Sequence, residues 1–208
     1  GESTPVVSPD SPPAGPEPRR RRAAYALFLA AAAFIYLQFV PHRGVHTFPD
    51  SYEYIEGSKP ALTDPRVYTA PRPALPLLFY KLVGTQPESF VPVQQAVDVL
   101  AWASLGLAAA WVVRRALSAG LALAVFALYS LSWNIAGWAQ LLLSESLTLS
   151  LFAAVVAMTL LWLDQPSRGR WAGLAGASVL FALARDNTPW LALVWGGLLA
   201  GAAGLTKA

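Results

Sequence analysis

The stretch RRRRAAYALFLAAAAFIYLQFV occupies residues 19–40 and places four arginines directly before a long apolar run. At about 1.5 Å per residue, a helix over residues 23–40 comes close to crossing the roughly 30 Å hydrocarbon core of a bilayer. A secretory signal peptide would have a shorter apolar core and a small-residue cleavage site. Because the run leads instead into Pro41, His42 and Arg43, we expect a retained membrane anchor.

The composition of the whole chain also indicates a membrane protein. Of its 208 residues, 55% are hydrophobic and 13% are charged, which is about half the charged share of an ordinary soluble domain. The net charge of +3 is modest and the basic residues form no stripe, so no nucleic-acid partner is expected. The absence of cysteine excludes a disulfide, a thiolate nucleophile and a thiolate metal site. Sparse lysine and abundant alanine, leucine, proline and arginine are typical of a GC-rich bacterial source.

Further apolar runs predict about six membrane-spanning helices, and with them an all-α integral membrane protein. After the first run they cover residues 92–113, 117–139, 147–163, 171–184 and 189–203. Residues 1–22 are rich in proline and end in the four arginines, which predicts a disordered cytoplasmic tail. Residues 23–208 would then form one transmembrane module. Because the chain ends soon after an apolar run, we expect it to be part of a longer protein.

The segment between the first two runs has a different character. Residues 42–90 carry acidic and basic side chains and recurrent prolines, and predict a large loop. Within this loop, residues 74–83 are apolar but too short to span a bilayer. We expect them to form a short helix that lies in the membrane interface.

The arginines also predict which side of the membrane each segment faces. Basic residues in short loops stay in the cytoplasm, so the N-terminus is expected inside, in a multi-pass plasma (inner) membrane protein. The alternation of six spans then places every other short basic loop inside, namely Arg114 with Arg115, Arg168 with Arg170, and Lys207. The loop 42–90 falls outside the cytoplasm, together with Asp98, Glu145 and Arg185. Polar groups gathered at one membrane face favour a cavity open to that face.

Tryptophans follow the same pattern. They gather at membrane interfaces, where their amphipathic rings lie among the lipid headgroups. The predicted inner ends carry Trp111, Trp162 and Trp171, and the predicted outer ends carry Trp133, Trp138 and Trp190.

Three motifs resemble the N-terminal module of GT-C-type glycosyltransferases, polytopic enzymes that use polyprenyl-phosphate-linked sugars outside the cytoplasm. The first is the acidic opening of the loop, FPDSYEYI at residues 48–55. The second is the proline- and arginine-containing stretch TAPRPALPLL at residues 69–78. The third is the element SESL at residues 144–147, with Ala184-Arg185 after the next helix. The resemblance covers about residues 23–203, and relatives usually have more helices, often with a C-terminal soluble domain.

The resemblance implies roles for particular residues. Asp50 would be the catalytic general base that deprotonates the acceptor hydroxyl. Arg185 and Arg72 would bind the phosphate of the donor, and Glu145 would line the same substrate-binding cavity. Some family members hold a divalent cation, so Asp50 and Glu53 would be the ligands of Mg²⁺ or Mn²⁺.

Each of these residues also has a simpler interpretation that stays open. Asp50 could be a solvated turn residue, Glu53 could belong to a solvated face, and Arg185 could extend to the interface. Glu145 could favour a helix N-terminus through the helix dipole. The remaining expectations are purely structural: Tyr52 and Tyr54 as interface anchors, Glu56 on the solvated face, and Asp98 in polar packing with Gln94.

The sequence therefore favours an enzyme, a glycosyltransferase that moves a hexosyl or pentosyl group from a polyprenyl-phosphate donor to a glycan, lipid or protein acceptor of the cell envelope. The alternative is a non-catalytic GT-C-like membrane protein that binds lipid or scaffolds a partner subunit. A transporter is a third class, which the absence of matched interrupted helices in two halves disfavours.

Overall fold

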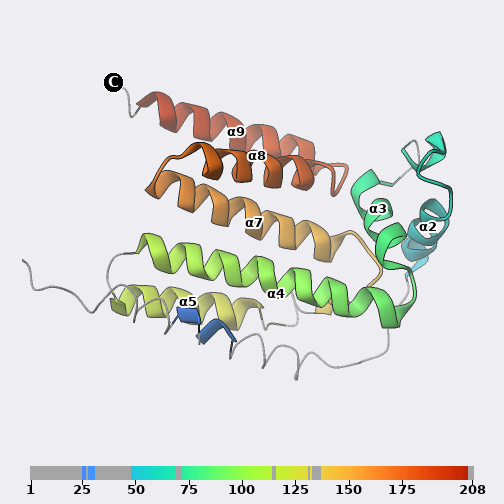
Figure 1. Ribbon diagram of the computed structural model, residues 1–208, viewed down its shortest axis with the longest axis horizontal. Coiled ribbons are helices and arrows are strands. Elements are labelled where there is room, and N and C mark those ends of the chain that lie inside the picture. The colour runs from blue at the N-terminus through green and yellow to red at the C-terminus, as the bar shows by residue number, and fades with distance from the viewer. Residues whose placement is uncertain are drawn as a thin grey trace, which may run out of the picture.

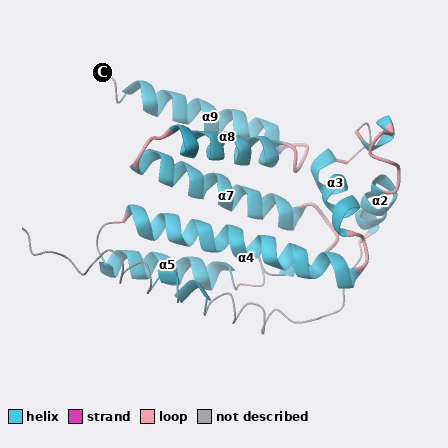
Figure 2. Cartoon of the chain, in the orientation of Figure 1, coloured by secondary structure: helices cyan, strands magenta, loops and turns pink. Residues whose placement is uncertain are grey.

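The computed structural model describes residues 25–26, 28–30, 48–68, 72–113, 116–130, 132 and 137–205. Most of the first predicted span, the predicted tail 1–22, Arg114, Arg115, Trp133 and Lys207 lie outside these residues, so the predictions made for them stay predictions. Every regular element of the described residues is a helix (Figure 2). The predicted all-α class is confirmed.

The long helices form a bundle in which neighbours along the chain run in opposite directions (Figure 1). Its members are α4 (Pro87–Val112), α5 (Ala116–Ser130), α7 (Glu145–Asp164), α8 (Arg168–Ala182) and α9 (Thr188–Leu205). Two shorter helices, α2 (Pro49–Ser58) and α3 (Ala74–Val83), lie together at the end of the bundle where α4 and α7 begin. The helix predicted over residues 74–83 is confirmed with the same bounds.

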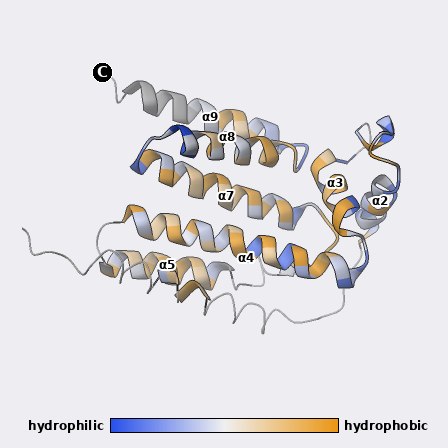
Figure 3. Cartoon of the chain, in the orientation of Figure 1, coloured by the Kyte–Doolittle hydropathy of each residue, from blue (hydrophilic) through white to orange (hydrophobic). Residues whose placement is uncertain are grey.

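Two of these helices, α4 and α7, are long and apolar enough to cross a membrane, with mean hydropathies of 1.4 and 2.1 over their most apolar segments. Only 39% of each segment is buried inside the protein, which leaves much apolar surface facing outward. At 15 residues each, α5 and α8 extend about 22 Å, less than the roughly 30 Å hydrocarbon core. Figure 3 shows the apolar character of the bundle and hydrophilic residues at the α7–α8 turn and around α2.

Prolines explain where α4 begins. The predicted run started at Pro92, but the helix starts at Pro87, which occupies a first-turn position. Proline suits that position because its fixed φ is already helical and its missing N–H would have no partner there. Glu88 adds a negative charge where the helix dipole favours one. Pro92 lies inside α4, so the sequence-based boundary was wrong by more than one turn.

The third predicted run, residues 117–139, is not one helix. Helix α5 ends at Ser130, and Gly137–Gln140 forms a separate 3-10 turn, η2. Serine side chains compete for backbone hydrogen bonds, and glycine costs backbone entropy in a helix, so this part of the run is a poor helix former despite its apolar content.

The core of the bundle lies between α4 and α7. Small residues allow the two backbones to approach, with Ala101 and Ala108 on α4 facing Ala153 and Ala157 on α7. A buried polar contact crosses the same interface, because the Ser150 hydroxyl donates to Asp98 Oδ1 over 3.1 Å. Asp98 is 1% exposed. This contact is with Ser150 on α7, and the predicted packing of Asp98 with Gln94 stays a prediction.

Candidate functional site

Helix α2 brings the acidic motif to the end of the bundle. Pro49 stands at its first position, and the backbone N–H of Phe48 donates to the Ser51 hydroxyl over 3.0 Å, which fixes the first turn. The helical period places Ser51 and Tyr54 on the buried face. Asp50 and Glu53 stay at the surface, with side chains 59% and 50% exposed.

Arg72 gathers the charged residues of α2. Its Nε lies 2.6 Å from Glu53 Oε2, and its Nη2 lies 3.0 Å from Asp50 Oδ1. Its guanidinium also lies over the Tyr54 ring, 5.5 Å from the ring centroid. A planar guanidinium can serve two carboxylates and an aromatic face at once, which a lysine ammonium cannot do equally well. The residues of the first two sequence motifs are therefore in direct contact.

The third motif supplies a further ion pair. Glu145 is the first residue of α7, and its Oε1 lies 3.3 Å from Nη2 of Arg185, in the turn before α9. The Thr188 hydroxyl shapes this turn, since it accepts from Arg185 N and donates to Arg185 O. The two interpretations of Glu145 are compatible. Its carboxylate lies at the N-terminus of α7 and also contacts the guanidinium of Arg185.

The Asp50–Arg72 and Glu145–Arg185 pairs lie around one polar cavity of about 120 Å³. Four of the predicted site residues line it together: Asp50, Arg72, Glu145 and Arg185. The cavity is also lined by Tyr54, Pro73, Leu143, Ser144 and Asp186. Glu53 reaches this group through Arg72. The alternation of helices predicted that the charged residues of the loop, Glu145 and Arg185 would lie together with Asp98. The structure brings Asp50, Arg72, Glu145 and Arg185 together, but Asp98 does not line the cavity and is buried beside Ser150.

Tyr54 is the residue that the sequence reasoning placed wrongly. The expected interface anchor is 3% exposed, whereas Tyr52 is 64% exposed. Burial raises the pKa of the Tyr54 phenol, against the opposing effects of its hydrogen bond with Ser144 and of the nearby Arg72. The phenol therefore stays protonated at neutral pH and offers a hydrogen-bond donor at the cavity. Recognition of α2 as a helix would have shown that Tyr54 shares a face with Ser51.

A buried tyrosine on α3 holds this end of the molecule together. The Tyr80 hydroxyl lies 2.5 Å from Gln94 Oε1 on α4 and donates to the carbonyl oxygen of Leu143 over 2.8 Å. Gln94 Nε2 donates in turn to the carbonyl oxygens of Ala139 and Leu141. These bonds fix the segment that leads into Ser144 and Glu145 against α3 and α4.

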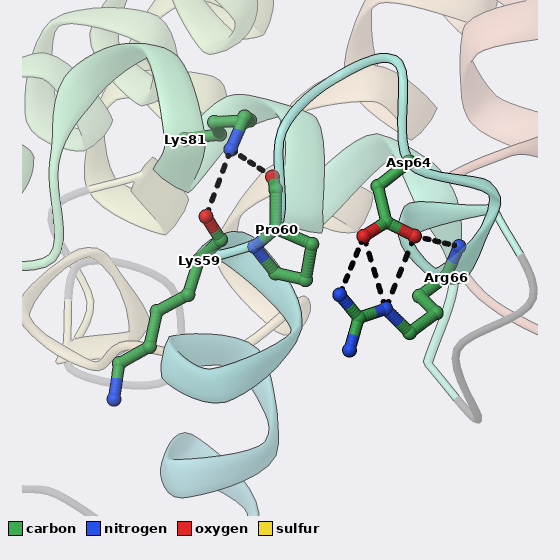
Figure 4. Close-up of polar contacts among 5 residues, drawn as sticks. All are labelled: Lys59, Pro60, Asp64, Arg66 and Lys81. Atoms are coloured by element: carbon green, nitrogen blue, oxygen red, sulfur yellow. Dashed lines mark hydrogen bonds and ion pairs between the residues drawn. The ribbon is translucent and has the colours of Figure 1, made fainter.

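Lys81 anchors the loop between α2 and α3 (Figure 4). Its Nζ donates to the carbonyl oxygens of Ser58, Lys59 and Pro60, at the C-terminal end of α2. An ammonium group is favourable there because the last carbonyls of a helix lack backbone partners. Farther along the loop, the Arg66 guanidinium binds both carboxylate oxygens of Asp64 and holds the pKa of that carboxyl below its usual range. These contacts hold the described part of the loop, which ends at Tyr68, against α2 and α3.

The contacts of Asp50 and Glu53 do not fit a resident divalent cation in this arrangement. Both carboxylates already pair with Arg72, whose single positive charge offsets one of their two negative charges. Within the described ranges, no group of three or more histidine, cysteine, aspartate or glutamate side chains could hold a metal ion. Mg²⁺ and Mn²⁺ prefer several oxygen ligands, so two shared carboxylates are a poor set. The metal stays a prediction of the resemblance.

Comparisons with family models, with curated proteins and with solved structures find no match to this chain.

Proposed function

We propose that the chain is the membrane module of a glycosyltransferase that moves a sugar from a polyprenyl-phosphate donor to an acceptor outside the cytoplasm. The proposal includes six spans in a plasma membrane, an N-terminus inside, and α2 and α3 at the outer face. Its main support is that one polar cavity is lined by Asp50, Arg72, Glu145 and Arg185, which come from separate parts of the chain. Such a group of acids and arginines suits a phosphate and an alcohol as substrates.

The chemistry assigned to the cavity is a direct displacement. The acceptor hydroxyl oxygen attacks the anomeric carbon of the donor, and its proton passes to Asp50. The bond between that carbon and the phosphate oxygen breaks, and polyprenyl phosphate leaves with its negative charge. Arg72 and Arg185 would bind the phosphate oxygens, since a guanidinium presents parallel N–H donors to them.

The arginines can exchange their present partners for a phosphate. Asp50, Glu53 and the Glu145–Arg185 pair are all partly exposed, with side chains between 23% and 59% accessible. Ion pairs of this kind contribute about 0–1 kcal/mol each. The donor phosphate is a diester with one negative charge, and a guanidinium can hold two of its oxygens through parallel hydrogen bonds. Donor binding is therefore expected to displace the carboxylates and to release Asp50 for proton transfer.

Substitution of Asp50 tests the proposal. The Asp50→Asn variant keeps the shape of the side chain and removes the base, so transfer from a radiolabelled polyprenyl-phosphate sugar should fall at least about 100-fold. Expression and membrane insertion should not change. Glu56→Gln is the matched control, because Glu56 lies on the same helix and pairs with Lys59 outside the cavity. Full transfer by Asp50→Asn would remove Asp50 from the mechanism.

The size of the cavity favours a second candidate, a non-catalytic membrane protein that binds a lipid or scaffolds a partner subunit. At about 120 Å³ the cavity is smaller than the roughly 300–1,000 Å³ of most ligand pockets. It could take a phosphate headgroup without a whole sugar. This candidate predicts no turnover and full tolerance of Asp50→Asn, and a stable complex with another membrane subunit would favour it.

A further inference from the structure

A second cleft lies at the opposite end of the bundle from the polar cavity, where α7 turns into α8. It has a volume of about 600 Å³ and is lined by Trp162, Pro166, Ser167, Arg168 and Trp171. Trp171 is 61% exposed, and the Trp162 ring is half-buried against α8. Most of the lining is therefore apolar, with one cationic side chain beside it.

Arg168 differs from every other described arginine. Arg66, Arg72 and Arg185 each pair with a carboxylate. Arg170 donates from Nη1 to the carbonyl oxygens of Leu161 and Gln165, which caps the end of α7. Within the described residues, no carboxylate lies within ion-pair distance of Arg168. Its guanidinium is exposed and available to a ligand from outside the chain.

The charged residues beside the cleft have a net positive charge. Asp164 ends α7 and is the acidic residue nearest in the sequence, whereas Arg168 and Arg170 begin α8. These three residues sum to one positive charge. A ligand with an anionic group would therefore be attracted, and it would find two indole rings beside its binding point.

The position of the cleft identifies the chemistry of this ligand. It opens at the end of α7, one of the helices that is long and apolar enough to cross a membrane. Tryptophan rings prefer the headgroup region of a bilayer, and arginine attracts the anionic lipids found there. An anionic headgroup attached to an apolar chain matches a cation beside an apolar cleft, whereas a soluble anion would leave the indole rings uncovered.

We propose that this cleft binds an anionic phospholipid, with the lipid phosphate on Arg168 and an acyl chain along Trp162 and Trp171. The site is separate from the cavity at α2 and does not depend on sugar transfer. Because of its place at the α7–α8 turn, an occupying lipid would hold these two helices together at one membrane face.

Native mass spectrometry of the full chain in detergent micelles tests the proposal, with phosphatidylglycerol and phosphatidylcholine as probes. Wild-type protein should retain phosphatidylglycerol at least about tenfold more strongly, the equivalent of one charge-assisted hydrogen bond. Arg168→Glu should abolish this preference, and Arg168→Lys should keep most of it. Trp171→Ala should weaken retention of both lipids.

Arg66→Glu is the matched control, because it makes the same charge change at an exposed arginine near α2. Circular dichroism checks that each variant is folded. We expect the Arg168 variants to fold, because Arg168 is exposed and pairs with no carboxylate of the described residues. Equal retention of the two lipids by wild-type protein would overturn the proposal. Unchanged phosphatidylglycerol retention by folded Arg168→Glu would also overturn it. A wild-type dimer that Arg168→Glu dissociates would overturn it too, because the cleft would then be an interface between two copies of the chain.

Discussion

Nη2 of Arg185 lies 3.3 Å from Oε1 of Glu145, although Glu145 begins α7 and Arg185 follows α8. This pair joins the Ser-Glu-x-Leu element to the Ala-Arg element at one end of the bundle. The backbone N–H of Leu75 donates to the carbonyl oxygen of Leu183 over 3.3 Å, which brings the start of α3 to the same turn. Parts of the second and third motifs, which are distant in the sequence, thus share one small region.

A double-mutant cycle should detect the Glu145–Arg185 pair. We expect a coupling free energy of about 0.5–1 kcal/mol from Glu145→Gln, Arg185→Gln and the double variant. The value is small because the two side chains are 23% and 44% exposed, where water screens the attraction. Unfolding of the four proteins in detergent provides the measurement. Strictly additive effects would show that the two residues do not interact.

Loss of the Tyr80 hydroxyl should destabilise the end of the molecule that carries the cavity. Tyr80→Phe removes the buried hydroxyl that lies between Gln94 Oε1 and the carbonyl oxygen of Leu143, and leaves Gln94, which is 2% exposed, without one partner. We expect a loss of about 1–3 kcal/mol and an apparent Tm lower by several degrees. Tyr52→Phe, at an exposed position on α2, should leave the Tm nearly unchanged. Equal Tm values for Tyr80→Phe and wild type would contradict these contacts.

Stability should fall at alkaline pH. Burial raises the pKa of Tyr54 and of Tyr80 above the ordinary phenol value of 10.0. Below that value both phenols are protonated in the folded and unfolded chains and contribute no pH dependence. Above it the unfolded chain releases protons that the folded chain retains, so the free energy of unfolding decreases as pH rises. Thermal unfolding between pH 8 and pH 11 should show this decline from about pH 10, and less steeply in Tyr80→Phe.

The sequence predicted the elements best where their ends are marked by residues with a strong local preference. Helix α3 has the predicted bounds because Pro73 precedes it and Gly84 follows it with a φ of +96°, a conformation that favours glycine. The predicted continuation of α5 to residue 139 failed because apolar content alone does not show where a helix stops. Local chemistry, more than hydropathy, decided these boundaries.

The candidate site was predictable only in its charged members. Alternation of helices was enough to bring Asp50, Arg72, Glu145 and Arg185 to one end. The contribution of Tyr54 was missed, because an aromatic residue in a polar loop looks like an interface anchor until the loop is known to be helical. The partner of Asp98 on α7 was also beyond the sequence, since the lateral order of helices in a bundle leaves no local pattern.

The central claim is that residues of the first and third motifs face one compartment outside the cytoplasm. Because the chain contains no cysteine, single cysteines can be introduced without background. Asp50→Cys, Glu145→Cys and Arg185→Cys should each react with a membrane-impermeant maleimide added to intact cells, whereas Arg168→Cys should react only after permeabilisation. Labelling of positions 50, 145 and 185 from opposite sides would contradict the account.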